Sequence, residues 1–468
     1  MTVAMHELRM LLRDGRARAG AVALLLLAAV ALASGLVRNQ SLAAERARAQ
    51  AVIAEQWTAQ GEKNPHSAAH YGSYAFRPVL PFAFFDAGVL PYAGVSIWLE
   101  AHKQNFAEGR PADDATPLAR FGELTLAFIL QALVPLALLL AAHASFAGER
   151  EQGTLRQVLA SGISPLRLFV GKFLGLGAAV LLLLAPLLLA IVLALAVAGD
   201  ASLWAGAASL LFAYLLYFAL LLLLALVVSA QASSSQSALL ILLGFWAVTT
   251  FALPRLAADV GRIVAPTPST VAFLRGIEAD IASGMGGDPP AERIARRREA
   301  LLRIYKVGSE AELPINFQGV VFGIQDEVGH AAYDHQFGLL HEAVDRQVDV
   351  FEAASILSPR MALMLISQEL SGTSLAHQRH FERGAETFRR QLMDVLNRDI
   401  TLNSKPGQAD YRAGADLWRR TGQYRYVPET LGERWARCAA PLTVLGLWTL
   451  ALLLAAWVTT RHLRVLSA

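Results

Sequence analysis

Five long runs without Asp, Glu, Lys or Arg constrain this chain more than any other feature. They cover residues 19–37, 124–148, 173–199, 201–254 and 438–460. A helix needs about 20 apolar residues to cross roughly 30 Å of hydrocarbon. The run 201–254 is long enough for two such helices, and the polar stretch SAQASSSQS at 229–237 separates them. The sequence therefore predicts an all-α polytopic membrane protein with six transmembrane helices.

The composition agrees with this prediction. The 468 residues are 55% hydrophobic and only 17% charged, whereas a soluble protein is about one quarter charged. The net charge of +3 could suggest a nucleic-acid partner, but the basic residues are scattered and form no aromatic-studded basic module. We therefore expect no nucleic-acid partner. The single cysteine, Cys438, excludes an internal disulfide and a cysteine-based zinc site.

Basic residues predict the orientation of the N-terminus. Several arginines precede the first apolar run, and short basic flanks of this kind stay in the cytoplasm. Leu8, Leu11 and Leu12 have helical spacing, which favours an amphipathic helix on the inner surface. A competing interpretation is a signal peptide cleaved at Ala31-Leu32-Ala33, but the apolar run is longer than a usual signal core. We expect a spanning helix.

The remaining topology follows from six crossings. The spans are expected at residues 19–37, 121–148, 173–257 (spans three to five) and 438–460. The cytoplasmic parts are an entry helix at 1–18, a segment at 149–172 and a tail at 461–468. The periplasmic parts are an insertion at 38–120 and a large, mainly helical domain at 258–437. The tail carries Arg461 and Arg464, in agreement with the charge rule. This organisation predicts a multi-pass protein of a bacterial inner membrane with both termini in the cytoplasm.

One further apolar segment, 78–99, could be mistaken for a span. It contains Pro78, Pro81, Pro91, Gly88 and Gly94. A lipid-exposed backbone interrupted this often could not satisfy its own hydrogen bonds. We expect this segment to lie on the membrane or to pack against the protein.

The region 258–437 has helical character. Residues 292–307 predict a basic helix, 316–357 one long helix or two broken near Gly338, and 374–400 a helix capped at Ser374. The long helix is expected to end before Ser358-Pro359, because proline disfavours the helical state of its predecessor. We find no strong strand pattern and no internal repeat.

Histidines are the candidate metal ligands of this region. The candidates are His330, His335, His341, His377 and His380, with Glu342 or Asp334 as a further ligand. Zinc sites use such spacings, but the sequence HEAVD lacks the second histidine of the zinc-protease motif. We expect these histidines to be structural and the chain to bind no metal.

A short charged segment, GEREQGTLRQVLASGISPLRLFVGKFLG (148–175), lies between the second and third spans. Gly153 and Gly162 delimit a small helix, 154–161, and Ser164 caps a following helix that begins at Pro165. One interpretation is a hairpin with ordinary snorkelling charges. The other is a docking element for a cytoplasmic protein, with Leu155, Val158 and Leu159 on the face that enters the partner.

This segment closely resembles the coupling segment that follows the second membrane helix in ABC-2-type permeases. The matching residues are Glu149, Arg150, Glu151, Gly153, Thr154, Leu155, Pro165, Gly171 and Lys172. The N-terminal stretch HELRMLLRDGR is similar to the entry helix of that family. Other stretches, such as HSAAHYGSYAFRPVLPFAFFDAG at 66–88, resemble an uncharacterised branch with large periplasmic insertions.

The resemblance implies a permease subunit of an ATP-driven exporter, which is not itself an enzyme. The chain has no Gly-x-x-x-x-Gly-Lys-Ser/Thr loop, so ATP would act only through a separate cytoplasmic ABC ATPase, and no cofactor would bind directly. The other expected partners are membrane lipids and a second permease, either an identical copy or a paralogue. The few polar groups within the spans favour a lipid-like or amphipathic cargo. Two alternatives remain: a subunit that transmits ATP-driven movement to periplasmic partners, and a membrane-anchored periplasmic metal enzyme.

Overall fold

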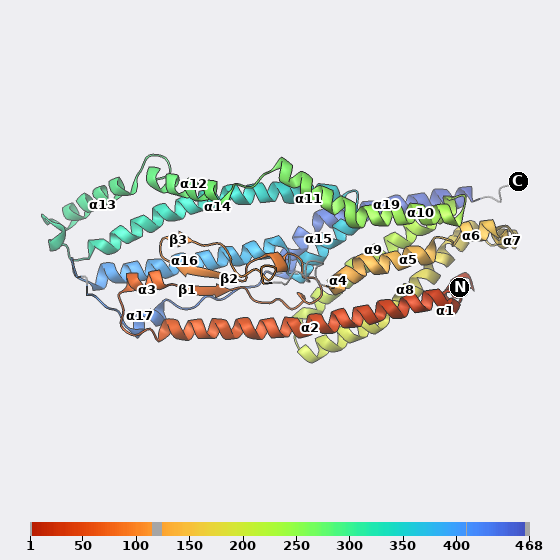
Figure 1. The fold of residues 1–468 in the computed structure, drawn as a ribbon, viewed down its shortest axis with the longest axis horizontal. Helices are drawn as coiled ribbons and strands as arrows, with labels where there is room; N and C mark the ends of the chain where they lie inside the picture. The colour runs from red at the N-terminus through yellow and green to blue at the C-terminus, as the bar shows by residue number, and fades with distance from the viewer. Residues whose placement is uncertain (1, 115–123, 409, 464–468) are drawn as a thin grey trace.

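The chain is elongated, with a bundle of apolar helices at one end and a polar region at the other (Figure 1). The computed structural model describes residues 2–114, 124–408 and 410–463. The predicted start of the second span at 121–123 and the tail beyond residue 463, including Arg464, lie outside the described residues. We refer to the described residues of 65–104 and 270–437 together as the distal region, and to the opposite extremity, which contains helix α7 (Thr154–Ala160), as the α7 end.

Within the part of the chain that the structure describes, six helices are long and apolar enough to cross a membrane, which confirms the predicted fold class. Four of them are α2 (Gly15–Thr58), α8 (Pro165–Ala198), α9 (Ser202–Gln231) and α19 (Ala439–His462). The second span is assembled from α4 (Leu126–Phe128), η3 (Ile129–Leu133), α5 (Val134–Ala142) and α6 (Ala147–Glu151). The fifth is assembled from α10 (Ser235–Ala247), η4 (Val248–Ala252) and α11 (Leu253–Val264).

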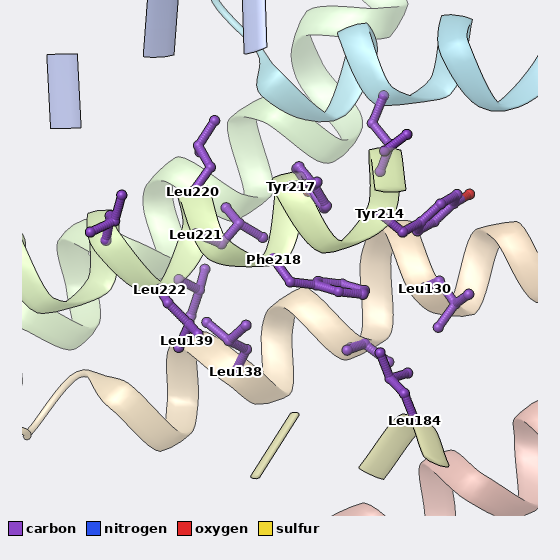
Figure 2. Close-up of a cluster of buried hydrophobic side chains, with 14 of the residues drawn as sticks. Leu130, Leu138, Leu139, Leu184, Tyr214, Tyr217, Phe218, Leu220, Leu221 and Leu222 are labelled. Carbon is purple, nitrogen blue, oxygen red and sulfur yellow. The ribbon is translucent and has the colours of Figure 1, made fainter. Parts of the chain in front are cut away.

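Helix α9 forms the centre of the bundle. Its most apolar window is 61% buried, whereas that of α8 is only 17% buried. Tyr214, Phe218 and Leu222 of α9 belong to the same buried cluster as Leu139 of α5 and Leu184 of α8 (Figure 2). The second span is equally buried, at 61%, whereas the other four spans are only 17–22% buried and present much of their apolar surface outward, as expected of helices that face lipid.

Each of the two composite spans contains a π-helical turn beside a proline. The turns η3 and η4 lie directly before α5 and α11, which carry Pro135 and Pro254 in their first turns. Proline cannot donate a helical hydrogen bond and crowds the carbonyl four residues earlier. Near Pro254, the carbonyl of Thr250 accepts a hydrogen bond from Arg360 at 3.2 Å. A distal side chain therefore satisfies a backbone group that the proline leaves unpaired.

The other helices have the following bounds. At the α7 end lie α1 (Thr2–Arg13) and α7 (Thr154–Ala160). The distal helices are α3 (Pro65–Tyr71), α12 (Thr270–Ser283), α13 (Pro290–Tyr305), α14 (Phe317–Ser355), α15 (Pro359–Ser371), α16 (Leu375–Asn403), α17 (Ala415–Arg420) and α18 (Leu431–Arg437), with the 3₁₀ turns η1 (Leu90–Tyr92) and η5 (Glu310–Glu312). Helix α14 continues through Gly338 as one helix. Ser374 precedes α16, but its hydroxyl bonds His377 Nδ1 at 2.8 Å instead of capping the helix.

The distal region contains a small antiparallel sheet that the sequence analysis missed. Its order is β1 (Ser73–Phe76), β2 (Ser96–Glu100) and β3 (Lys103–Gln104). Ser73 pairs with Leu99, and Glu100 pairs with Lys103. The strands are only two to five residues long, which is too short for an alternating pattern to be recognised with confidence in a sequence.

The apolar segment 78–99 packs against the protein and forms no spanning helix. Phe82, Phe84 and Phe85 enter the buried cluster of the bundle. A Cβ atom at Gly206 of α9 would lie 2.7 Å from Phe82 Cε2, and one at Gly35 of α2 would lie 2.8 Å from the Phe84 carbonyl oxygen. Glycine at these two positions permits the segment to close on the bundle.

Helices α2 and α15 are among the elements that connect the bundle to the distal region. Helix α2 continues beyond the predicted span 19–37 for 44 residues in total, or about 66 Å. Near its far end, Trp57 packs edge-on against Trp418 at 5.9 Å and donates to Thr421 Oγ1 at 2.8 Å. Helix α15 returns from the distal region, and its buried residues Leu363 and Ile366 join the core of the bundle. Movement of the bundle is thus mechanically connected to the distal region.

Candidate coupling site at the α7 end

The charged segment 148–175 folds as the short helices α6 and α7 at the extremity of the bundle and the start of α8, which packs against α1 (Figure 1). Gly153 adopts a left-handed conformation with φ 74°, which glycine tolerates, and this turn separates helices α6 and α7. The Thr154 hydroxyl donates to the Glu149 carbonyl at 3.2 Å across this turn. Ser164 caps α8 by accepting from Arg167 N–H at 3.4 Å, and Pro165 is its first residue, as the sequence predicts.

Lys172 is the centre of the site. Its side chain is 1% exposed and forms ion pairs with Glu7 of α1 and Glu149 of α6, the latter with a Nζ–Oε1 distance of 2.6 Å. The ammonium also lies 5.4 Å from the centroid of the Phe146 ring, within cation–π range. We call Glu7, Glu149 and Lys172 the Lys172 junction. It joins the entry helix, the second span and the third span at one buried point.

Small residues allow α1 to approach α8 beside this junction. A Cβ atom at Gly171 would lie 2.6 Å from Val3 Cβ, and one at Gly175 would lie 2.6 Å from the Ala4 carbonyl oxygen. Glycines spaced four residues apart permit the same close approach between membrane helices. Gly171 thus has a packing role, next to the charged role of Lys172.

Arg150 and Glu151 hold the turn between α9 and α10. The Arg150 guanidinium donates to the carbonyls of Ala232 at 2.7 Å and Ala230 at 2.5 Å, at the C-terminus of α9. The Glu151 carboxylate accepts from Ser235 N–H at 2.9 Å and from its hydroxyl at 2.7 Å, at the N-terminus of α10. Both charges complement the helix dipoles that they face. The three charged residues 149–151 therefore fix α6 directly to α8, α9 and α10, and through Lys172 to α1.

The apolar face of α7 differs from its expected role. Leu155 is 7% exposed and belongs to the core of the bundle, and Val158 and Leu159 pack partly buried against that core. They were expected to fill a cleft in a partner, but here they anchor α7 to its own chain. An apolar helix face in a sequence does not tell an internal core from an external one. The exposed side of α7 instead contains Gln157 and Ala160.

Sequence reasoning did not identify two residues of the site. Glu7 lies in the entry helix, but nothing in the sequence pairs it with a lysine 165 residues away. Ser229 of α9 accepts from the backbone N–H groups of Phe146 at 3.0 Å and Ala147 at 3.2 Å. The buried hydroxyl thus orients the start of α6. Its only signal in the sequence is its place at the edge of the polar stretch 229–237.

Of the five histidines selected from the sequence, His377 and His380 share Glu429 as a neighbour, at 3.3 and 4.0 Å, and the other three have different surroundings. His335 Nδ1 lies 2.8 Å from Asp280 Oδ2, and His380 Nε2 lies 2.7 Å from the Val427 carbonyl. Burial, followed by Arg437 and Arg434, lowers the pKa of His377 to about 3, and burial with nearby arginines lowers the pKa of His330 to about 4. His341 lies beside the Phe337 ring. Throughout the described ranges, none of the five belongs to a group of three metal-ligating side chains.

The six spans and the folded charged segment define the class: a multi-pass membrane protein with a built cluster of charged contacts at one end of its bundle. A family model described as ABC-2 family transporter protein matches residues 1–459. The chain therefore belongs to the ABC-2 transporter family and is a permease subunit of an ABC transporter. Permeases of this family work with an ABC ATPase subunit. No curated protein matches the chain.

Proposed function

We propose that this permease couples ATP hydrolysis by a separate cytoplasmic ATPase to outward movement of a substrate across a bacterial inner membrane. The observation that carries the proposal is the Lys172 junction. It connects the charged helix pair to the entry helix and the third span through a single buried cation. In this orientation the α7 end faces the cytoplasm, and a second permease, identical or paralogous, completes the transporter.

The contacts of α6 supply a route for the movement. A force on α7 reaches α6 across the short Gly153 turn. From α6, Glu149 transmits it to α1 and α8 through Lys172, and Arg150 with Glu151 transmits it to α9 and α10. A rigid-body shift of α6 would consequently tilt several spans together, which is how packed helices respond to a local displacement.

The docking surface in this proposal is the exposed side of α7. Gln157 and Ala160 are exposed there, while Leu155 is buried on the opposite side. The ATPase therefore contacts the polar side and the tip of α7, and the leucines transmit the contact inward. Truncation or obstruction of a central interface residue commonly costs about 2 kcal/mol of binding free energy.

The test compares two matched substitutions of exposed alanines at opposite ends of the bundle. Ala160→Glu is expected to weaken co-purification of the ATPase by about 30-fold, since this factor corresponds to about 2 kcal/mol. Ala201→Glu, in the turn before α9, is expected to leave co-purification and the ATPase activity of the complex unchanged. Equal ATPase recovery with both variants, at equal membrane insertion, would contradict docking at α7.

A second candidate function is mechanical, and helix α2 favours it. Without a break, α2 runs from the bundle to the distal core around Trp57 and Trp418. ATP-driven tilting of α2 would therefore move the distal region even without transport of a cargo. This function uses the same ATPase contact, but it predicts that movement of the distal region depends on the continuity of α2.

Spin labels can distinguish the two candidates. In a Cys438→Ser background, we would label cysteines at the exposed positions Glu62 and Ala201 and measure their separation with and without ATP. The mechanical function predicts an ATP-dependent change, which insertion of two glycines after Leu42 abolishes while ATP hydrolysis continues. An unchanged separation in the intact complex would favour export alone.

A further inference from the structure

Three imidazoles that no sequence motif connects converge in the distal region. His66 and His70 are one turn apart on α3, with their Nε2 atoms 3.1 Å apart. His102 lies in the turn between β2 and β3, with its ring centroid 5.4 Å from His66 and 5.3 Å from His70. One ring nitrogen of each histidine lies within 4.8 Å of the other two. The three side chains range from half-buried to exposed, so solvent can reach them.

The distances suit a single small metal ion. Zinc–nitrogen bonds of about 2.0–2.1 Å in a tetrahedron place neighbouring ligand atoms about 3.3 Å apart. The separation of the His66 and His70 nitrogens is close to this value, and a ring nitrogen of His102 lies within 4.8 Å of both. Two histidines one helical turn apart on the same helix face are also a recurrent pair of zinc ligands.

A buried carboxylate orients the third histidine. Asp326 of α14 is 5% exposed, and its Oδ1 atom lies 2.8 Å from His102 Nδ1. Its other oxygen accepts from Asn397 Nδ2 at 2.7 Å. A carboxylate that accepts from Nδ1–H leaves Nε2 as the metal-ligating atom, and most ligating histidines have such a partner.

The backbone also fixes the positions of the ligands. His102 has φ 62°, a left-handed conformation that is uncommon for residues other than glycine. The preceding Ala101 donates its N–H to the Ala69 carbonyl at 3.0 Å, which ties the turn directly to the helix between His66 and His70. On the other side, the Phe322 ring stacks on His66 with centroids 3.7 Å apart and an interplanar angle of 2°. Strained positions that surrounding contacts maintain are often functional.

We propose that His66, His70 and His102 bind one divalent transition-metal ion, with zinc as the favoured metal and a fourth position for water or an exchangeable ligand. Imidazole ligands suit zinc, copper and nickel, whereas magnesium and calcium prefer oxygen. The ligands lie on α3 and in the β2–β3 turn, and Asp326, which bonds His102, lies on α14. The ion therefore fastens α3 and the β2–β3 turn to the long distal helices. This site departs from the sequence-based expectation of no metal and does not depend on ATP coupling.

Metal binding by the full-length protein in detergent tests the proposal. We would purify it without a histidine tag, remove metal with a chelator and titrate zinc, with cobalt as a spectroscopic probe. The expected result is one zinc ion per chain and an intense visible cobalt spectrum typical of a tetrahedral site. His70→Ala is expected to weaken zinc binding by at least about 100-fold, and Asp326→Asn by about 10–100-fold.

Matched histidine variants supply the controls. His335→Ala and His380→Ala remove histidines that bond Asp280 and a carbonyl, respectively, and should leave zinc affinity unchanged. Zinc should raise the unfolding temperature of the wild type and of both controls but not that of His70→Ala, whose metal-free unfolding temperature should match the wild type. If the wild type binds zinc no more tightly than His70→Ala, the His66–His70 contact is only a hydrogen bond and the proposal is wrong. Equal loss of zinc in His335→Ala would also overturn it.

Discussion

The two ends of the molecule differ in how many partners each buried charge has. At the α7 end, Lys172, whose side chain is 1% exposed, is the cation that pairs with both Glu7 of α1 and Glu149 of α6. In the distal region, charge is shared among several overlapping pairs. Examples are Arg389 with Glu386 at 2.7 Å and Arg390 with Glu386 and Asp334, each at 2.6 Å.

This difference predicts how each end responds to loss of one charge. Removal of one partner from a buried ion pair is costly because it leaves an uncompensated charge out of water. At the Lys172 junction, loss of the cation leaves two acidic groups facing each other. In the distal network of Arg389, Glu386, Arg390 and Asp334, Glu386 keeps a second arginine when one is lost, and Asp334 is exposed enough to be hydrated. The α7 end should therefore depend on single residues, and this distal network should tolerate their loss.

The largest effect is expected for Lys172→Met. The substitution keeps most of the apolar volume but leaves Glu7 and Glu149 unpaired, and breaking a buried pair typically costs about 3–5 kcal/mol. We expect a clear decrease in the unfolding temperature in detergent, together with release of α1, detected as faster proteolysis at the N-terminus.

Charge removal from the two partners provides the control for Lys172→Met. Addition of Glu7→Gln and Glu149→Gln to the methionine variant should recover much of the lost stability, since no uncompensated charge remains. A triple variant that is less stable than Lys172→Met would show that the lysine acts through packing and not through its charge.

A smaller effect is expected for Gly171→Ala. The added Cβ would lie 2.6 Å from Val3 Cβ, and overpacking of this kind costs about 1–3 kcal/mol. Gly244→Ala is the matched control, because nothing lies within 4 Å of its Cβ position in α10; it should be neutral or slightly stabilising. Thermal unfolding of both variants in detergent measures the difference. Equal stabilities would mean that α1 adjusts freely on α8.

The sequence predicts the features that depend on local composition. Charge-free runs are sufficient to find the spans, because lipid permits few other solutions for the backbone. Gly153, Ser164 and Pro165 predict the ends of α7 and the start of α8, since each acts on its own neighbours. The packing of Leu155 against the bundle was not predictable. An amphipathic pattern identifies the apolar face of a helix, but it does not identify what that face contacts.

Contacts between residues far apart in the sequence could not be predicted. Glu7 and Lys172 are 165 residues apart, and no spacing rule applies over such a distance. His102 is separated from His66 and His70 by strands too short to recognise, so no spacing rule connects the three histidines. The orienting carboxylate, Asp326, lies a further 224 residues beyond His102. Such clusters require the fold before they can be identified.

The smallest effect is expected for Arg390→Gln in the distal region. Arg390 connects α16 to α14 by two hydrogen bonds to Asp334, of 2.9 and 2.6 Å. However, the Asp334 side chain is 59% exposed and can be hydrated, and Glu386 keeps its bonds to Arg389. Partly exposed ion pairs contribute about 0–1 kcal/mol, so the unfolding temperature should fall only slightly. Arg398→Gln, which removes an exposed pair within α16, should have no measurable effect. If Arg390→Gln destabilises the protein as much as Lys172→Met, the distal charges form one cooperative network, and the contrast between the two ends is wrong.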